Sequence, residues 1–135
     1  MLSRSVLFAC ALALAGCPGG DEQPPECITV DVNCAPLYTP TFTNVYNMTI
    51  KPSCGSALSA CHSASNPQGG LSLADEQSAY DGLLRDRVKA GDPGCSEMIV
   101  RTSSPGKDYE MPPGSPLSAA TQCALIQWVQ NGAQR

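Results

Sequence analysis

The sequence predicts a small all-α domain with long loops. Four segments place apolar residues at helical spacing, and no segment of comparable length alternates as a strand would. The 135 residues include twelve prolines and twelve glycines, and only 5% of them are aromatic, so we expect much loop and a limited core. Something besides the hydrophobic core should therefore hold the domain together.

The N-terminal segment predicts export and a lipid anchor. Arg4 precedes an apolar run over residues 6–15 that is too short to cross a bilayer, as in a signal peptide. The letters "LAGC", which end at Cys17, resemble the lipobox of bacterial lipoproteins, in which the cysteine carries lipid and begins the mature chain. We therefore expect a signal peptide over residues 1–16 and a lipid on Cys17 that holds the protein to a membrane. The alternative is a secreted protein in which Cys17 is an incidental thiol.

The segment after the anchor predicts a tether. Residues 18–26 are rich in proline, glycine and acid and have no apolar side chain to bury. We expect residues 17–40 to form a lipidated tether and irregular arm, followed by one folded domain over residues 41–135. Pro18, which stands where an aspartate would favour the inner membrane, favours the periplasmic side of the outer membrane in the cell envelope.

The first two helices have recognisable ends. A helix over residues 42–50 is capped by Thr41, and Pro52 should stop it. A second helix is expected from about residue 73 to 84, with Ser72 in the capping position.

Two further helices complete the domain. Asp92 and Pro93 predict the start of a short helix that carries Met98. Ser118 predicts the start of the last helix, which should end at Gly132. The longest loop lies between these two helices and contains "YEMPPGSP".

Charge and residue types argue against two classes of function. Without Arg4, seven Lys and Arg face twelve Asp and Glu, a net charge near −5, and the cations are not clustered as a nucleic-acid partner would require. The sequence has no histidine-rich metal set and no phosphate-binding glycine loop. Two carboxylate pairs, Asp75 with Glu76 and Asp108 with Glu110, indicate helix capping and a solvated loop. We do not expect an enzyme.

Cys61 is followed directly by His62, the only histidine, and Cys54 lies upstream. Two cysteines with a histidine after the second have the outline of a c-type haem site, in which the thiols bind the two vinyl groups and the histidine binds the iron. The usual outline leaves two residues between the cysteines, and here there are six. The alternative is a Cys54 to Cys61 disulfide with His62 as a solvated neighbour.

Six cysteines remain for an oxidising compartment once Cys10 and Cys17 are set aside. We expect Cys27 to pair with Cys34 in a small local loop and Cys95 to pair with Cys123 as a long-range bridge, which leaves Cys54 and Cys61 for each other or for haem. Six cysteines allow fifteen pairings, so the sequence leaves the others open.

Three methionines lie beyond the signal peptide, and one of them stands in a stiff loop. Met111 precedes Pro112 and Pro113, whose fixed φ angles restrict the backbone, and a weak thioether ligand needs such a rigid loop. Met48 and Met98 fall within predicted helices, where packing is the expected role.

The order of these pieces resembles the c-type cytochrome domain, in the version found on bacterial lipoproteins. From about residue 42 to 133 the sequence shows an aromatic-bearing helix, a cysteine before "CH", "GGLSL", a helix with a tyrosine, "AGDP", "MPPG" and "IQWVQNGA". The resemblance implies a cytochrome c-like fold and one covalent haem c on Cys54 and Cys61. It further implies His62 and Met111 as the ligands of the haem iron.

The expected function is that of a lipid-anchored electron carrier, or of a haem module in a larger oxidoreductase. Its partners would be the membrane, through Cys17, and a redox protein that the sequence does not identify. The alternative, from another class, is a haem-free, disulfide-stapled lipoprotein that serves as a structural or binding module.

Overall fold

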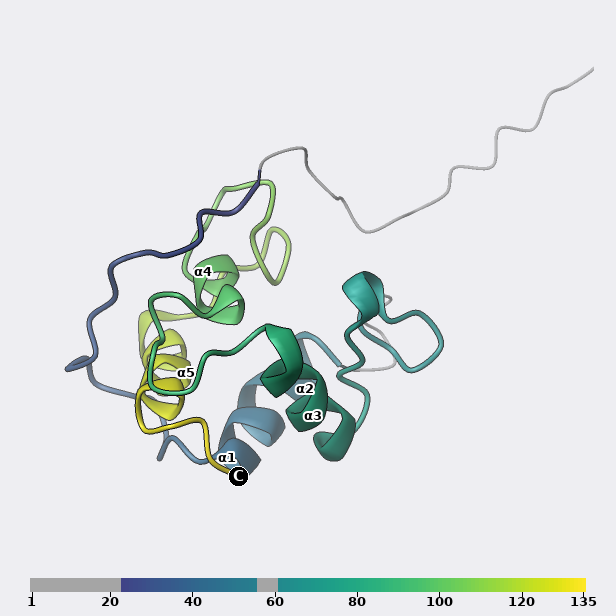
Figure 1. Cartoon of the computed structure of the whole chain (residues 1–135), viewed down its shortest axis with the longest axis horizontal. Helices are drawn as coiled ribbons and strands as arrows, with labels where there is room; N and C mark the ends of the chain where they lie inside the picture. The colour runs from purple at the N-terminus through teal and green to yellow at the C-terminus, as the bar shows by residue number, and fades with distance from the viewer. Residues whose placement is uncertain (1–22, 56–60) are drawn as a thin grey trace, which may run out of the picture.

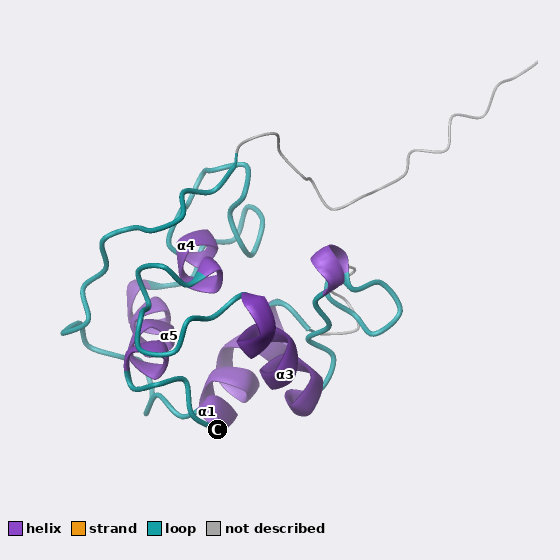
Figure 2. Ribbon diagram, viewed as in Figure 1, coloured by secondary structure: helices purple, strands orange, loops and turns teal. Residues whose placement is uncertain are grey.

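The computed structural model describes residues 23–55 and 61–135, and within them it contains helices and loops but no strand (Figure 2). The all-α fold class is confirmed. An isolated bridge between His62 and Pro67 is the only strand-like pairing in this part of the chain. The predicted signal peptide and the lipid site at Cys17 lie outside the described residues.

The first helical segment is longer than predicted. It consists of α1 (Phe42–Val45), a π-helical turn (Tyr46–Ile50) and α2 (Lys51–Ser53). Thr41 caps it as expected, because its side chain accepts a hydrogen bond from the Asn44 N–H.

The prediction that Pro52 stops this segment is wrong, since the helix continues to Ser53. In a regular α-helix the proline ring would clash with the carbonyl group four residues earlier. Here the preceding turn is π-helical, with the Lys51 N–H bonded to the Tyr46 carbonyl, and this wider turn gives the ring room.

Helix α3 (Glu76–Asp86) begins later than predicted, so the expected cap at Ser72 is wrong. Asp75 is the cap instead, and its carboxylate accepts a hydrogen bond from the Ser78 N–H at 2.9 Å. Its negative charge also suits the start of a helix.

Helix α4 (Glu97–Thr102) also begins later than predicted, because Asp92 and Pro93 form a turn rather than a first helical turn. The Asp92 carboxylate accepts from the Cys95 N–H at 3.1 Å, which closes the turn. Ser96, fully buried, donates from its hydroxyl to the Asp92 carbonyl at 2.8 Å and stands at the cap of α4.

The prediction for the last helix is confirmed. Helix α5 (Ala119–Gln130) is capped by Ser118, which accepts from the Thr121 N–H at 3.1 Å. At its end Gly132 has φ of 94°, and the Ala133 N–H reaches back to the Trp128 carbonyl. This is the Schellman ending, which favours glycine at that position.

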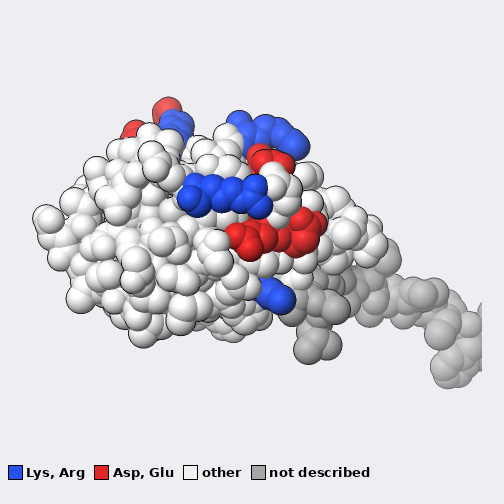
Figure 3. All heavy atoms as spheres, turned by 90° about the horizontal axis from the view of Figure 1, so that it is seen from below, with Lys and Arg blue, Asp and Glu red and all other residues white. Residues whose placement is uncertain are grey.

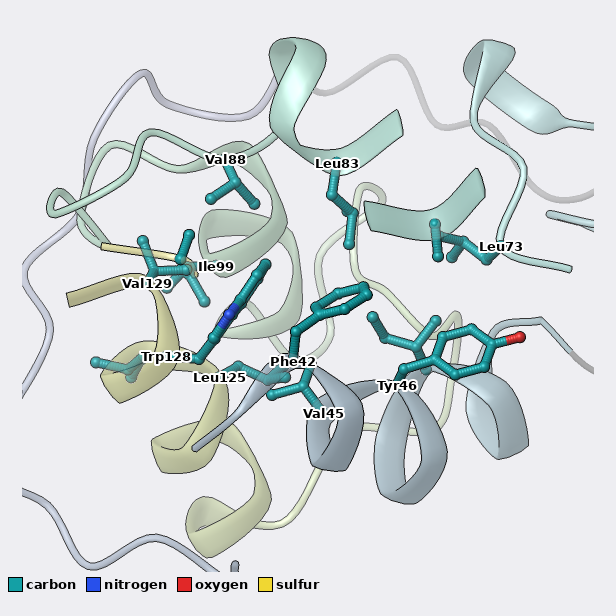
Figure 4. Close-up of a cluster of buried hydrophobic side chains, with 14 residues drawn as sticks. Phe42, Val45, Tyr46, Leu73, Leu83, Val88, Ile99, Leu125, Trp128 and Val129 are labelled. Carbon is teal, nitrogen blue, oxygen red and sulfur yellow. The ribbon is translucent and has the colours of Figure 1, made fainter. Parts of the chain in front are cut away.

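The core is built around an aromatic cluster that joins α1, α3 and α5 (Figures 1 and 4). The Phe42 ring lies 5.1 Å from Trp128 and 4.8 Å, edge to face, from Tyr80. Trp128 and Tyr80 both place their polar atoms on the C-terminal segment, where they donate to the carbonyls of Gln134 and Ala133. Burial of these rings therefore leaves no unmet donor on either one.

The predicted disulfide pairing is wrong. Cys27 is bonded to Cys95 and Cys34 to Cys123, with sequence separations of 68 and 89 residues. Both bridges join the N-terminal arm to the helical domain, whereas the prediction closed a loop within the arm.

The path of the arm explains this pairing. Figure 1 shows residues 23–40 running around the outside of α4 and α5. The Ile28 N–H donates to the Gly94 carbonyl at 2.9 Å, and the Leu37 N–H donates to the Ala120 carbonyl at 2.9 Å. The Gln127 side chain donates to the Cys34 carbonyl at 2.8 Å. Contacts this distant along the chain bring each arm cysteine to a partner that no local pattern indicates.

Charged side chains of both signs lie next to one another on the surface shown in Figure 3. That face is otherwise uncharged and carries no large patch of one sign in the part of the chain that the structure describes. Over residues 23–55 and 61–135, none of the helices has the length and apolar character needed to span a membrane.

We predict that replacing Cys34 and Cys123 together with alanine lowers the free energy of unfolding by about 2 to 5 kcal/mol, because the bridge restricts a long loop in the unfolded chain. Urea unfolding of this variant and of the unaltered protein measures the difference. Peptide mapping of the unaltered protein should recover Cys27 linked to Cys95, and a Cys27 to Cys34 peptide would contradict the observed pairing.

Candidate functional site

The candidate site is a cavity of about 320 Å³ beside the core, a size suited to a small organic ligand. Cys54, Cys61, His62 and Met111, the four site residues that the sequence analysis proposed, all line it. Most of its wall is aliphatic, with side chains from three different parts of the chain: Ile50, Leu71, Leu73, Leu83, Leu117 and Leu125.

His62 is held with one ring nitrogen already committed. Its Nδ1 lies 3.0 Å from the Leu71 carbonyl oxygen. A carbonyl oxygen can only accept, so Nδ1 must carry the hydrogen, and in the neutral ring Nε2 then keeps its lone pair. A hydrogen bond of this kind fixes the orientation of a metal-binding imidazole and makes it a stronger donor.

The backbone around His62 is also fixed. The Leu73 N–H donates to the His62 carbonyl at 2.8 Å, and the Gln68 N–H donates to the Cys61 carbonyl at 2.8 Å. The chain reverses between these contacts through a short 3-10 turn, Gln68–Gly70. The "GGLSL" segment thus folds back onto Cys61 and His62. Its backbone forms hydrogen bonds with both the carbonyl and the ring of His62.

Cys54 stands at the end of the first helical segment, where its N–H donates to the Ile50 carbonyl at 2.8 Å. The next residue, Gly55, touches the "GGLSL" segment so closely that a Cβ there would lie 2.1 Å from the Leu73 carbonyl oxygen. Burial raises the pKa of the Cys54 thiol to about 11, so the thiol is protonated at neutral pH and is a poor nucleophile in the folded domain. Neither bridge from the arm uses Cys54 or Cys61, but Cys61 is itself disulfide-bonded.

Two of the three methionines considered reach the cavity. Met111 lines it together with Pro112 and Pro113, and its N–H donates to the Arg101 carbonyl at 3.2 Å. Met98 on α4 lines it as well, although the sequence analysis assigned it only a packing role. Met48 is 52% exposed and does not line the cavity. The structure therefore offers a second thioether that helical spacing alone did not distinguish from a core residue.

A charged cluster on the cavity wall was missed by the sequence analysis. Arg87 Nη1 lies 2.6 Å from one Glu97 carboxylate oxygen, and Arg101 Nε lies 2.7 Å from the other. Burial alone would raise the pKa of Glu97, but the hydrogen bonds and charges of the two guanidinium groups outweigh it and hold the pKa below its ordinary value. Glu97 and Arg101 are four residues apart on α4, a spacing that could have indicated their pairing, whereas nothing local indicates Arg87.

The donor groups suit a metal held within an organic ligand. Among the described residues no group of three or more His, Cys, Asp or Glu is placed to hold a metal ion directly. One imidazole and a thioether on an apolar cavity instead match a haem, in which the macrocycle supplies four ligands and the protein supplies two. The residues present therefore fit this group.

One protein family matches the segment that contains many of the residues lining the cavity. A family model described as Planctomycete cytochrome C matches residues 59–115, which is less than half of the chain. The matched segment contains Cys61, His62 and Met111, and Cys54 lies outside it. Searches of curated proteins and of solved structures found no match. The match over these residues, together with the all-α fold, supports a c-type cytochrome-like domain.

Proposed function

We propose that this protein is a lipid-anchored electron-transfer protein that binds one haem covalently. The observation that carries the proposal is the cavity, because one largely aliphatic space is lined both by the adjacent Cys61 and His62 and by Met111 from a distant loop. The family match over residues 59–115 supports the same role, since it includes all three residues.

His62 and Met111, which both line the cavity, would hold the iron. The Nε2 atom of His62 is the free donor, and the Leu71 carbonyl keeps the ring in place. The sulfur of Met111 would be the other ligand, on a backbone stiffened by Pro112 and Pro113. If His62 and Met111 both bound the iron, no iron position would remain for a substrate, which would favour an electron carrier over an enzyme.

The bound haem would supply one-electron oxidation and reduction. The protein's part is to set the potential and to exclude water. His and Met ligation raises the reduction potential, and a buried, apolar setting is a further influence on it. A raised potential suits delivery of electrons to an acceptor, which we expect to be a redox protein of the cell envelope.

The two cysteines differ in how they could attach the group. Cys61 precedes His62, so a thioether at Cys61 would carry the imidazole to the iron. Cys61 is disulfide-bonded in this structure, so its attachment to haem would require the reduced thiol. Cys54 is buried, with a thiol whose pKa is raised to about 11, and it lies outside the family match. We therefore infer that any thioether at Cys54 forms before the domain closes around it, and that Cys61 alone can keep the haem attached.

A second candidate is a haem-free, disulfide-stapled lipoprotein that serves as a structural or binding module. The observation in its favour is the pair of bridges that join the arm to the domain, since they stabilise the fold independently of any bound group. Visible absorbance distinguishes the two candidates.

We predict that the protein, exported by a host with cytochrome-maturation machinery, shows a Soret band that stays with the polypeptide in denaturing gel electrophoresis. His62→Ala should lose most of this absorbance because it removes the nitrogen that would hold the iron. Cys61→Ala should release the haem on denaturation, Cys54→Ala should retain it, and exposed Met48→Ala is the control. Absence of a Soret band, with Cys54 linked to Cys61 in the mass spectrum, would favour the haem-free module.

We predict that Met111→Ala keeps the haem, lowers the reduction potential and abolishes the weak long-wavelength band of thioether-ligated ferric haem. Met98→Ala should keep that band and lower the free energy of unfolding, by an amount up to about 2 to 5 kcal/mol for a buried methionine. Redox titration and absorption spectra of the two variants provide the comparison. If the band disappears in Met98→Ala and persists in Met111→Ala, then α4 and not the "MPPG" loop supplies the ligand.

We predict that Cys17→Ser releases the protein from the membrane fraction, because lipid on this cysteine is the proposed anchor. The variant should keep the thermal unfolding curve of the unaltered domain. Ultracentrifugation of cell extracts, followed by detection of the protein in pellet and supernatant, measures the release. A variant that still sediments with membranes would contradict lipidation as the anchor.

A further inference from the structure

The loop that carries Met111 is stiffened directly on one side only. Pro112 and Pro113 follow Met111, whereas none of the five residues before it is a proline. One of those five, Gly106, has φ of 77°, in the region that glycine enters more readily than other residues. Another contact must therefore hold the chain before Met111 if its sulfur is to stay at one place on the cavity wall.

Glu110, the residue before Met111, makes that contact. It is buried, only 7% exposed, and it is not among the described residues that line the cavity. Its Oε2 accepts a hydrogen bond from the Gly106 N–H at 2.9 Å, while its own N–H donates to the Lys107 carbonyl at 2.9 Å. These two bonds close residues 106–110 into a single turn around the buried carboxylate.

The closed turn is attached to α4 on both sides of Glu110. The Tyr109 carbonyl accepts from Arg101 Nη1 at 3.4 Å, and the Met111 N–H donates to the Arg101 carbonyl at 3.2 Å. In Figure 1 the loop accordingly turns back beside α4. The helix fixes the backbone of Glu110 and the Gly106 contact fixes its side chain, so the backbone that carries Met111 has little freedom to turn.

Resting on the proposed function, we propose that Glu110 is a positioning residue that keeps the Met111 sulfur at the haem iron. Contacts behind a metal ligand orient it, and the loss of one typically lowers metal affinity by about ten- to a hundredfold. A thioether is a weak ligand of iron, so a loosened loop would let another ligand compete for its place. Glu110 acts through Met111, since its own side chain lies outside the described cavity wall.

The second carboxylate oxygen of Glu110 makes a conservative variant available. Oε1 is buried and has no hydrogen-bond partner among the described residues. Glu110→Gln can therefore keep the bond to Gly106 through its amide oxygen and place its nitrogen where no bond is lost. Glu110→Ala instead removes the acceptor of the Gly106 N–H. Asp108→Ala, which removes an exposed carboxylate from the same loop, is the matched control.

The test titrates the haem-loaded, full-length protein in its ferric state with imidazole, which competes with Met111 for the iron. Glu110→Ala should bind imidazole about tenfold more tightly than the unaltered protein, as the loss of one hydrogen bond would give, and should show a weaker long-wavelength thioether band. Glu110→Gln and Asp108→Ala should match the unaltered protein in both measurements. Lower stability alone would change neither measurement at a temperature where every variant is folded.

Amide hydrogen exchange of the Gly106 N–H tests the contact itself and needs no variant. In the haem-loaded protein we expect this N–H to exchange at least about tenfold more slowly than in an unstructured peptide, although Gly106 is exposed. Glu110→Ala should remove this protection, and Asp108→Ala should keep it. Exchange in the unaltered protein at the rate of an unstructured peptide would overturn the inference, even where Glu110→Ala fails to fold.

The remaining outcomes separate this inference from the proposed function. Equal imidazole affinity in Glu110→Ala and the unaltered protein would refute the positioning role and leave haem binding intact. An equal rise in Asp108→Ala or Glu110→Gln would show that the charge of the loop, and not the bond to Gly106, is responsible. Unchanged imidazole affinity in Met111→Ala would refute the ligand assignment, and a protein without a Soret band would refute the haem proposal. Either result overturns this inference as well.

Discussion

A cavity beside the core of a small domain is the constraint on which the rest of this structure depends. Protein interiors are close-packed, and an unfilled space deprives its walls of contacts. Leu73, Leu83 and Leu125 belong both to the core and to the cavity wall. The face that each leucine turns toward the cavity makes no packing contacts with the core, so the core has fewer contacts than a filled one of the same size. The aromatic cluster around Phe42 and the two bridges from the arm supply stabilisation that does not depend on the cavity being filled.

Local signals in the sequence predicted the helix ends correctly where those ends depend on contacts between residues close together in the chain. The caps at Thr41 and Ser118 and the ending at Gly132 are contacts between residues a few positions apart, and all three are confirmed. The failures involve competition or distance. Asp92 caps a turn instead of a helix, because its carbonyl accepts a hydrogen bond from the buried hydroxyl of Ser96. The cysteine pairing failed since the path of the arm over α4 and α5 leaves no trace in local spacing.

The candidate site shows the same division. Adjacency in the sequence indicated Cys61 and His62, and a proline-stiffened loop indicated Met111, and these residues do line one cavity. Arg87 stands at the end of α3, whereas Glu97 lies on α4. Helical spacing within one segment therefore could not predict that these two residues form an ion pair. Met98 has the spacing of a core residue on α4 yet borders the cavity, because a helix next to a hollow space turns part of its packing face toward that space.

The close approach of Gly55 to Leu73 bears on the unusual interval between the two cysteines. Leu73 is a shared anchor, since its carbonyl oxygen abuts Gly55 while its N–H bonds the carbonyl of His62. Both ends of the intervening segment are therefore located by one residue outside it. The number of residues between Cys54 and Cys61 is then a property of the connection and not of the site, so homologous chains could lengthen or shorten that connection without displacing either end.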